Sequence, residues 1–218
     1  MLELYGHPFS SYSWKAQIAL LEKGVAFTPR TIDGEHPDHG ATLRGHWPLG
    51  KFPVLVDGDR AVIESSIIIE YLDLHYPGSR RLLPDDPAAA LAVRFMDRIF
   101  DNHVMGPTQA VVNEYLIDAQ KPDRARIERA QAALDIIYAW LDQRLGAQDW
   151  ACGADFSMAD CAAAPSLFYA DWVRPIEARF GRLRDYRGRL LARPSVAQCV
   201  EEARPFRGFF PPGAPDRD

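Results

Sequence analysis

The spacing of hydrophobic and polar positions changes near residue 77. Before it, apolar residues come in short runs that predict four strands, at residues 2–5, 25–32, 53–57 and 59–64. Two amphipathic stretches predict helices, at residues 11–24 and 65–76. The last two strands flank Gly58 and predict a hairpin. The predicted order is therefore β-α-β-β-β-α, with at most a short helix between the second and third strands.

A linker separates this part from a second one. Residues 77–87 include three prolines and a glycine, which interrupt regular helices. Beyond them, apolar residues recur every three or four positions and predict helices at residues 88–118, 124–145, 157–171 and 195–204. We expect the charged end of the tail to be disordered. The chain thus divides into an α/β domain at residues 1–77 and an all-helical domain at residues 88–210.

Composition narrows the classes of function. Of the 218 residues, 30 are acidic and 25 are basic, so the net charge is -5 and nothing drives binding to nucleic acid or to an anionic membrane. The apolar runs are too short to span a bilayer, and the first ten residues do not resemble a signal peptide. Three widely spaced cysteines do not resemble a disulfide framework. We therefore expect a cytoplasmic protein with free thiols.

The first candidate site is Gly-Lys-Phe-Pro-Val at residues 50–54. Pro53 opens a predicted strand, where it cannot donate a ladder hydrogen bond. It marks either a plain turn or a cis peptide bond. A cis bond would turn the N–H and C=O of Phe52 outward, so that an extended peptide ligand could pair with them like an added strand.

The second candidate is Glu64-Ser65-Ser66, between a predicted strand and a predicted helix. Serine here is explained by ordinary helix capping. The same helix start also offers free N–H groups to a carboxylate, and Glu64 could receive an ammonium group. A ligand with an amino-acid end would satisfy both.

The third candidate is the group of serines at residues 10, 11 and 13, at the start of the first predicted helix. One of these hydroxyls is expected to cap the helix. Another could donate to a thiolate and lower the pKa of the thiol, aided by the helix dipole. No G-x-S-x-G motif is present, so the stretch does not suggest a serine nucleophile.

Two further patterns carry no predicted chemistry. Ser157 and Asp160 have the spacing of a capping box, which is a folding element. His36 and His39 are close in sequence, but no third ligand with metal-site spacing is near them. We predict no metal.

Taken together and in order, these segments resemble the glutathione S-transferase superfamily. The resemblance covers almost the whole chain and rests on YGHPFSSYSWKAQIAL (5–20), PLGKFPVL (48–55), ESSIIIEYL (64–72) and GADFSMAD (153–160). It implies a thioredoxin-like N-terminal domain, an all-helical C-terminal domain, glutathione as co-substrate and a homodimer.

The resemblance also implies which residues hold glutathione: Lys51, Phe52, Pro53, Glu64, Ser65 and His39. Phe52 would pair through its backbone with the cysteinyl unit. Glu64 and Ser65 would hold the γ-glutamyl end. Lys51 would add a contact, and His39 would meet the glycyl carboxylate.

The hydroxyl that activates the thiol is the open question. SSYSWKAQIAL is similar to the zeta-class pattern SSCSWRVRIAL, in which serine stabilises the thiolate, and the motif as a whole looks zeta- or theta-like. This similarity favours Ser11, then Ser10. Tyr5 competes, because other classes use a tyrosine near the end of the first strand. Tyr12 replaces the zeta cysteine, which puts zeta-type isomerase chemistry in doubt.

The expected function is conjugation of the glutathione thiolate to a small hydrophobic electrophile, as in detoxification. The predicted walls of the electrophile pocket, which could equally be helix core, are Phe100, His103, Val104, Pro107, Val111 and Tyr115. Phe209 and Phe210 of the tail would cover it. The alternatives are a glutathione-dependent isomerase of maleylacetoacetate type and a non-catalytic glutathione-binding or interaction protein on the same fold.

Overall fold

A four-stranded mixed sheet forms the centre of the N-terminal domain in this computed structural model, which describes residues 2–78 and 80–218. Residue 1 of the expected domain and Ser79 of the expected linker lie outside the described residues. The strands are β1 (Leu2–Gly6), β2 (Phe27–Thr31), β3 (Val54–Asp57) and β4 (Arg60–Ile63). Their order in the sheet is β2-β1-β3-β4. β1 runs parallel to β2 and antiparallel to β3, and β4 pairs antiparallel with β3.

Helices cover both faces of this sheet. They are α1 (Ser11–Lys23), α2 (Pro37–His46) and α3 (Ser65–His75). Side chains alternate along a strand, so neighbouring residues meet different helices. Leu4 and Leu55 belong to the main core together with residues of α1 and α3. Tyr5 and Val54 point to the other face, where they pack with Leu43 of α2.

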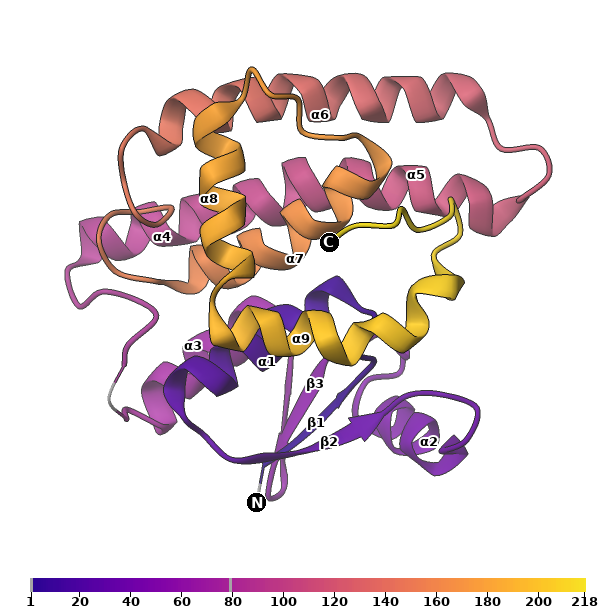
Figure 1. Cartoon of the computed structure of the whole chain (residues 1–218). Coiled ribbons are helices and arrows are strands. Elements are labelled where there is room, and N and C mark those ends of the chain that lie inside the picture. The colour runs from indigo at the N-terminus through magenta and orange to yellow at the C-terminus, as the bar shows by residue number, and fades with distance from the viewer. Residues whose placement is uncertain (1, 79) are drawn as a thin grey trace.

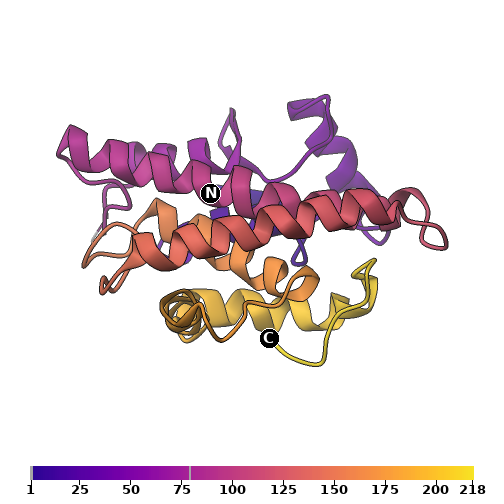
Figure 2. The same ribbon diagram turned by 90° about the horizontal axis from the view of Figure 1, so that it is seen from above.

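Every described element after the linker is helical. These elements are α4 (Pro87–Ile99), the π-helical segment η1 (Phe100–Met105), α5 (Gly106–Ile117), α6 (Arg124–Leu145), α7 (Met158–Val173), α8 (Gly181–Leu191), α9 (Pro194–Ala203) and the 3-10 segment η2 (Arg204–Phe209). α4, η1 and α5 follow one another without a break, and α6 packs along α5 (Figures 1 and 2). All residues of α7 are buried, so this helix is the centre of the domain.

The two domains meet along α1. Trp14 of α1 packs against Tyr169 of α7, with ring centroids 5.5 Å apart. α9 lies across α1 (Figure 1) and is tied to it by Arg193 and Ser195, which both donate hydrogen bonds to the Glu22 carboxylate. These contacts fix α1 against the helical domain, and α1 begins at the candidate serines.

The predicted architecture, a thioredoxin-like domain followed by a helical one, is confirmed, and so is the hairpin around Gly58. The sequence pattern does not predict α8, because its buried side is narrow and arginines surround Tyr186. The expectation of a disordered tail is wrong. Arg217 donates hydrogen bonds to the carboxylate and the carbonyl oxygen of Asp171 in α7, and this contact holds the tail in place.

Candidate functional site

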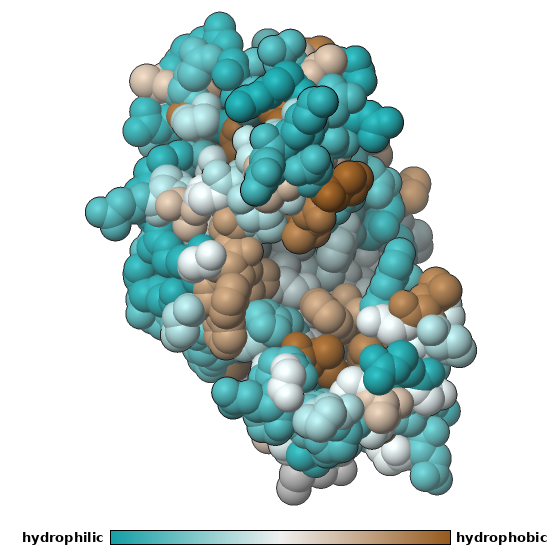
Figure 3. All heavy atoms as spheres, turned by 90° about the vertical axis from the view of Figure 1, so that its right-hand side faces the viewer, coloured by the Kyte–Doolittle hydropathy of each residue, from teal (hydrophilic) through white to brown (hydrophobic). Residues whose placement is uncertain are grey.

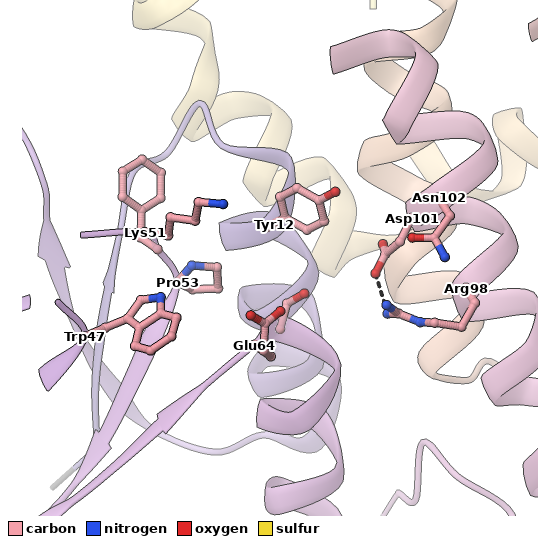
Figure 4. Close-up of a pocket in the computed structure, with 10 residues that line it drawn as sticks. Tyr12, Trp47, Lys51, Pro53, Glu64, Arg98, Asp101 and Asn102 are labelled. Carbon is pink, nitrogen blue, oxygen red and sulfur yellow. Dashed lines mark hydrogen bonds and ion pairs between the residues drawn. The ribbon is translucent and has the colours of Figure 1, made fainter. Parts of the chain in front are cut away.

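A polar cavity of about 300 Å³ lies between the two domains (Figure 4). Its lining residues are Tyr12, Trp47, Lys51, Phe52, Pro53, Glu64, Ser65, Arg98, Asp101 and Asn102. The loop before β3 provides one side of the cavity, and the helical domain provides the opposite side with Arg98, Asp101 and Asn102. The two short segments singled out in the sequence, at 50–54 and 64–66, are therefore brought together here.

Backbone geometry presents both segments to the cavity. The Phe52–Pro53 peptide bond is cis. Glu64 has a φ of 69°, in the left-handed region that few residues other than glycine adopt. Its side chain makes no capping bond to α3, so the carboxylate is free to face the cavity. Ser65 is the first residue of α3, where backbone N–H groups lack partners within the helix.

The charges in the polar cavity are mixed. Lys51 and Arg98 supply positive charge, and Glu64 and Asp101 supply negative charge. Burial raises the pKa of the Asp101 carboxyl, and the nearby Lys15 ammonium opposes that rise. A ligand that carries both an ammonium and a carboxylate group complements this arrangement better than a ligand of a single charge.

A second, larger cavity of about 730 Å³ adjoins the first and is mostly apolar. It shares Tyr12, Lys51 and Phe52 with the polar cavity, and its other lining residues are Phe9, Ser10, Ser11, Gly50, Met105, Thr108, Gln109, Val112, Asn113, Leu116, Tyr169, Phe209, Phe210 and Pro211. The face in Figure 3 is hollowed between the two domains, and hydrophobic residues gather around the hollow. Lys51 is the only charged side chain among these lining residues, so the cavity favours an uncharged occupant.

The candidate hydroxyls have different surroundings. The Ser10 hydroxyl accepts a hydrogen bond from the Ser13 N–H at 3.2 Å and caps α1. The Ser13 hydroxyl accepts one from the His7 N–H and is buried. Ser11 lies beside them on the apolar cavity, next to its junction with the polar cavity at Tyr12.

The two tyrosines of this region differ in position. Tyr5 lies on the other face of the sheet, donates its hydroxyl proton to Glu3, and lines neither cavity. Burial raises the pKa of the Tyr5 phenol. Tyr12 lines both cavities, and burial likewise raises the pKa of its phenol. Neither phenol is poised to ionise at neutral pH.

Several of the other predicted site residues lie elsewhere. His39 contacts the carbonyl oxygen of Thr31 through Nδ1 and stacks on His36, away from the polar cavity. The predicted walls of the electrophile pocket, Phe100, His103, Val104, Pro107, Val111 and Tyr115, do not line the apolar cavity. Phe100, Val104 and Val111 are core residues, and His103 is exposed. Phe209 and Phe210 of the tail do line it.

The cavity wall on α5 and the end of η1 is displaced by one residue from the predicted one. It runs through Met105, Thr108, Val112 and Leu116. Hydrophobic periodicity identifies the side of a helix that faces the core. The adjacent side, about 100° around the helix, faces the cavity and mixes apolar with polar residues. No pattern in a single sequence marks such a side.

The sequence also gives little sign of Trp47, Arg98, Asp101 and Asn102 in the polar cavity. The last three lie at the junction of α4 and η1, within a continuous helical pattern. The one available signal in the sequence is that Asp97 and Asp101 are four residues apart on a predicted helix, and the structure shows both of them buried. Buried aspartates need partners, and here two of those partners, Lys15 and Ser66, come from the other domain.

The thiols of the chain lie away from both cavities. Cys161 and Cys199 are buried, Cys152 is partly buried, and all three are free. Burial raises the pKa of the Cys152 thiol to about 12. Across residues 2–78 and 80–218, no group of histidine, cysteine and carboxylate side chains could hold a metal ion. Within the same residues no helix is both long and apolar enough to cross a bilayer.

Comparison with known proteins identifies the family. Residues 4–80 match the model of the glutathione S-transferase N-terminal domain, and residues 124–189 match that of the C-terminal domain. A stringent starvation protein A homolog of Coxiella burnetii is 33% identical over 171 residues, which cover 77% of this chain and 75% of the relative. The chain belongs to the glutathione S-transferase superfamily. The N- and C-terminal domains described above are thus the two domains of a glutathione S-transferase fold.

Two other relatives of the superfamily bear on the site. A probable maleylacetoacetate isomerase of Vibrio cholerae is 28% identical over 213 residues, covering 94% of this chain and 97% of that protein. A glutathione S-transferase of Methylobacterium radiotolerans, solved in complex with glutathione sulfonate, is 31% identical and superimposes with a TM-score of 0.77. That match covers 91% of this chain and 94% of the solved chain.

Proposed function

We propose that this protein is a glutathione transferase that joins the glutathione thiolate to an uncharged, hydrophobic electrophile. The observation that carries the proposal is the junction of the two cavities at Tyr12, Lys51 and Phe52, with Ser11 beside it. A tripeptide in the polar cavity would then present its sulfur to a molecule in the apolar cavity.

The polar cavity offers a group for each part of glutathione. Glu64 and Asp101 accept hydrogen bonds from the γ-glutamyl ammonium group, and Ser65 with the start of α3 binds its carboxylate. The backbone of Phe52 pairs with the cysteinyl unit. Lys51 lies where it can contact the remaining carboxylate. His39 lies outside the lining, and we assign it no contact.

The chemistry requires a thiolate at neutral pH. Ser11 donates its hydroxyl proton as a hydrogen bond to the sulfur, which favours the charged form and lowers the pKa of the thiol. The thiol proton passes to solvent. The sulfur lone pair then forms a carbon–sulfur bond, and the electrophile either expels a leaving group with its bonding electrons or takes up a proton after addition.

The near absence of charged side chains among the lining residues of the apolar cavity argues against maleylacetoacetate as the substrate. Maleylacetoacetate carries two carboxylates, whereas Lys51 is the only charged side chain among the lining residues. Two carboxylates in such a cavity would lack partners. The Vibrio relative keeps this alternative open, and the name of the Coxiella relative, which states no enzymatic activity, does the same for an interaction protein.

The test combines binding and turnover. Titration of the ultraviolet thiolate absorbance of bound glutathione is expected to give a thiol pKa at least one unit below that of free glutathione, which corresponds to about 1.4 kcal/mol. Turnover of an uncharged aromatic halide should exceed turnover of maleylacetoacetate. The reverse order would establish the isomerase, and binding with an unshifted thiol pKa would leave an interaction protein.

We also propose a cytoplasmic homodimer. Free cysteines support a reducing compartment. The dimer is supported by exposed Ile67 and Leu74 on α3 and exposed Leu91 and Phe95 on α4, which together form the α3–α4 face. Such a face, with four large hydrophobic side chains in water, is typical of protein interfaces.

A further inference from the structure

A buried lysine joins three elements behind the polar cavity. Lys15 of α1 is 1% exposed. Its Nζ lies 2.6 Å from Asp97 Oδ1, 2.7 Å from Asp101 Oδ2 and 2.7 Å from Ser66 Oγ. Arg98 completes what we call the Lys15 cluster, and it donates hydrogen bonds to Ser66, Asp97 and Asp101.

The cluster lies directly behind the cavity wall. Asp101 and Arg98 line the cavity themselves (Figure 4), and Ser66 follows the lining residue Ser65 in the sequence. Lys15 is one helical turn beyond Ser11 on α1. The cluster therefore connects the helix that carries the candidate hydroxyl, the start of α3, and the helical domain.

Lys15 compensates the negative charges of two buried aspartates, Asp97 and Asp101. The side chains of Asp97 and Asp101 are only 2% and 7% exposed, and two carboxylates this close repel each other. The Arg98 side chain is half exposed, so it compensates them less well than a buried cation. Burial raises the pKa of the Asp101 carboxyl, and the Lys15 ammonium, which contacts it, opposes that rise by favouring the ionised form. Lys15 and Arg98 both contact the Oδ2 atom of Asp101, which leaves the Oδ1 atom of Asp101 to meet a ligand.

We propose that Lys15 is a positioning residue for glutathione, which holds the Asp101 carboxylate, charged and correctly oriented, for the ammonium group of the ligand. This inference rests on the proposed function, because it assumes that glutathione occupies the polar cavity. Lys15 itself does not line that cavity.

The chain contains a matched control. Lys23 lies two turns further along α1, is also buried, and forms an ion pair with Asp73 at 2.8 Å. It holds the linker through the carbonyl oxygen of Arg80 and lies away from both cavities. Lys15→Met and Lys23→Met therefore each remove a buried ion pair from the same helix, and only the Lys15 pair includes a residue that lines the polar cavity, Asp101.

The readout is the dissociation constant of glutathione, compared with that of N-acetylglutathione, which lacks the ammonium group. Lys15→Met should weaken glutathione binding about tenfold and N-acetylglutathione binding less than twofold. Lys23→Met should change neither by more than about twofold. Lys15→Arg keeps the positive charge and should retain most of the affinity for glutathione.

The outcomes are separable. If wild-type protein does not bind glutathione, the proposed function fails and this inference fails with it. If wild-type protein binds, but Lys15→Met binds glutathione equally well or loses both ligands equally, only the positioning role of Lys15 is overturned. An equal loss of glutathione affinity in Lys23→Met would also overturn it, because the loss would then reflect general destabilisation of the protein.

A milder pair of variants covers the case in which Lys15→Met does not fold. Ser66→Ala removes only the hydroxyl between Lys15 and Asp97, and Ser195→Ala removes a hydroxyl that donates to Glu22 on the same helix. Ser66→Ala should weaken glutathione binding about threefold while Ser195→Ala leaves it unchanged. Equal affinities in the two variants would overturn the proposal.

Discussion

Ser10 and Ser11 are adjacent in the chain, yet the surroundings of their hydroxyls differ. Ser10 satisfies one of the free N–H groups at the start of α1, which is the ordinary task of a capping serine. Ser11 lines the apolar cavity, beside the junction with the polar cavity at Tyr12. Capping and thiol activation therefore need not compete for one side chain, because each serine can perform one of them.

Alanine substitutions at the two serines are expected to have different effects, one on the pKa of the thiol and the other on stability. Ser11→Ala should raise the pKa of the bound thiol by about one unit, equivalent to about 1.4 kcal/mol, and lower kcat about tenfold, with the thermal midpoint nearly unchanged. Ser10→Ala should cost about 1 kcal/mol of stability through loss of the cap and leave the thiol pKa near its wild-type value.

Thiolate titration and thermal unfolding of both variants check this pair. A raised thiol pKa in Ser10→Ala, with none in Ser11→Ala, would exchange the two roles. An unchanged thiol pKa in both would direct attention to Tyr12, which also lies at the junction.

The residues proposed to bind glutathione could be predicted from the sequence wherever they belong to a short motif. Five of the six proposed residues, Lys51 to Pro53 with Glu64 and Ser65, line one cavity. His39 does not, because α2 lies on the other face of the sheet and His39 contacts the Thr31 carbonyl oxygen there. Arg98 and Asp101 could not be predicted in this way, because no short motif contains them. Their neighbours in the site come from distant parts of the chain.

Among the elements, α7 depends most on a single side chain. The buried Asp160 carboxylate accepts hydrogen bonds from the N–H and hydroxyl of Ser157, from the Ala151 N–H and from the Tyr186 hydroxyl. It thus caps α7, fixes the preceding loop and holds α8. The spacing of Ser157 and Asp160 predicted the cap, whereas the contacts to Ala151 and Tyr186 depend on tertiary packing.

Loss of this carboxylate should be far more costly than loss of an exposed cap. Asp160→Ala removes the acceptor of two N–H groups and two hydroxyls, and we expect a loss of about 3 kcal/mol or more. Asp123→Ala removes the exposed cap of α6 and should cost about 1 kcal/mol. Urea unfolding of both variants measures the difference, and equal losses would contradict the central role given to Asp160.

At the scale of the whole molecule, the α3–α4 face is held as one surface. Glu70 of α3 and Arg94 of α4 form a two-pronged ion pair with both contacts at 2.8 Å, and this pair links the two domains. The exposed hydrophobic residues on either side of it therefore keep their relative positions. A second copy that packed on this face would contact both domains at once.

The proposed dimer can be tested by a single charged substitution on this face. Phe95→Glu buries a carboxylate in the proposed interface and should convert the dimer to a monomer, as measured by light scattering after size-exclusion chromatography. Ile117→Glu places the same charge on an equally hydrophobic but separate site at the end of α5 and should leave the dimer intact. A wild-type monomer, or dissociation of both variants, would argue against the α3–α4 face.

The placement of the three cysteines has an analytical consequence. Two are buried, the third has a thiol pKa near 12, and all lie away from the cavities, so the protein itself offers little reactive thiolate. In the complex, the sulfur that meets an alkylating reagent would belong to the ligand. In an alkylation assay, reaction of the protein's own thiols is therefore expected to be low, so that the sulfur of one bound ligand can be quantified. None of the three cysteines lines a cavity, where oxidised glutathione could form a mixed disulfide with it.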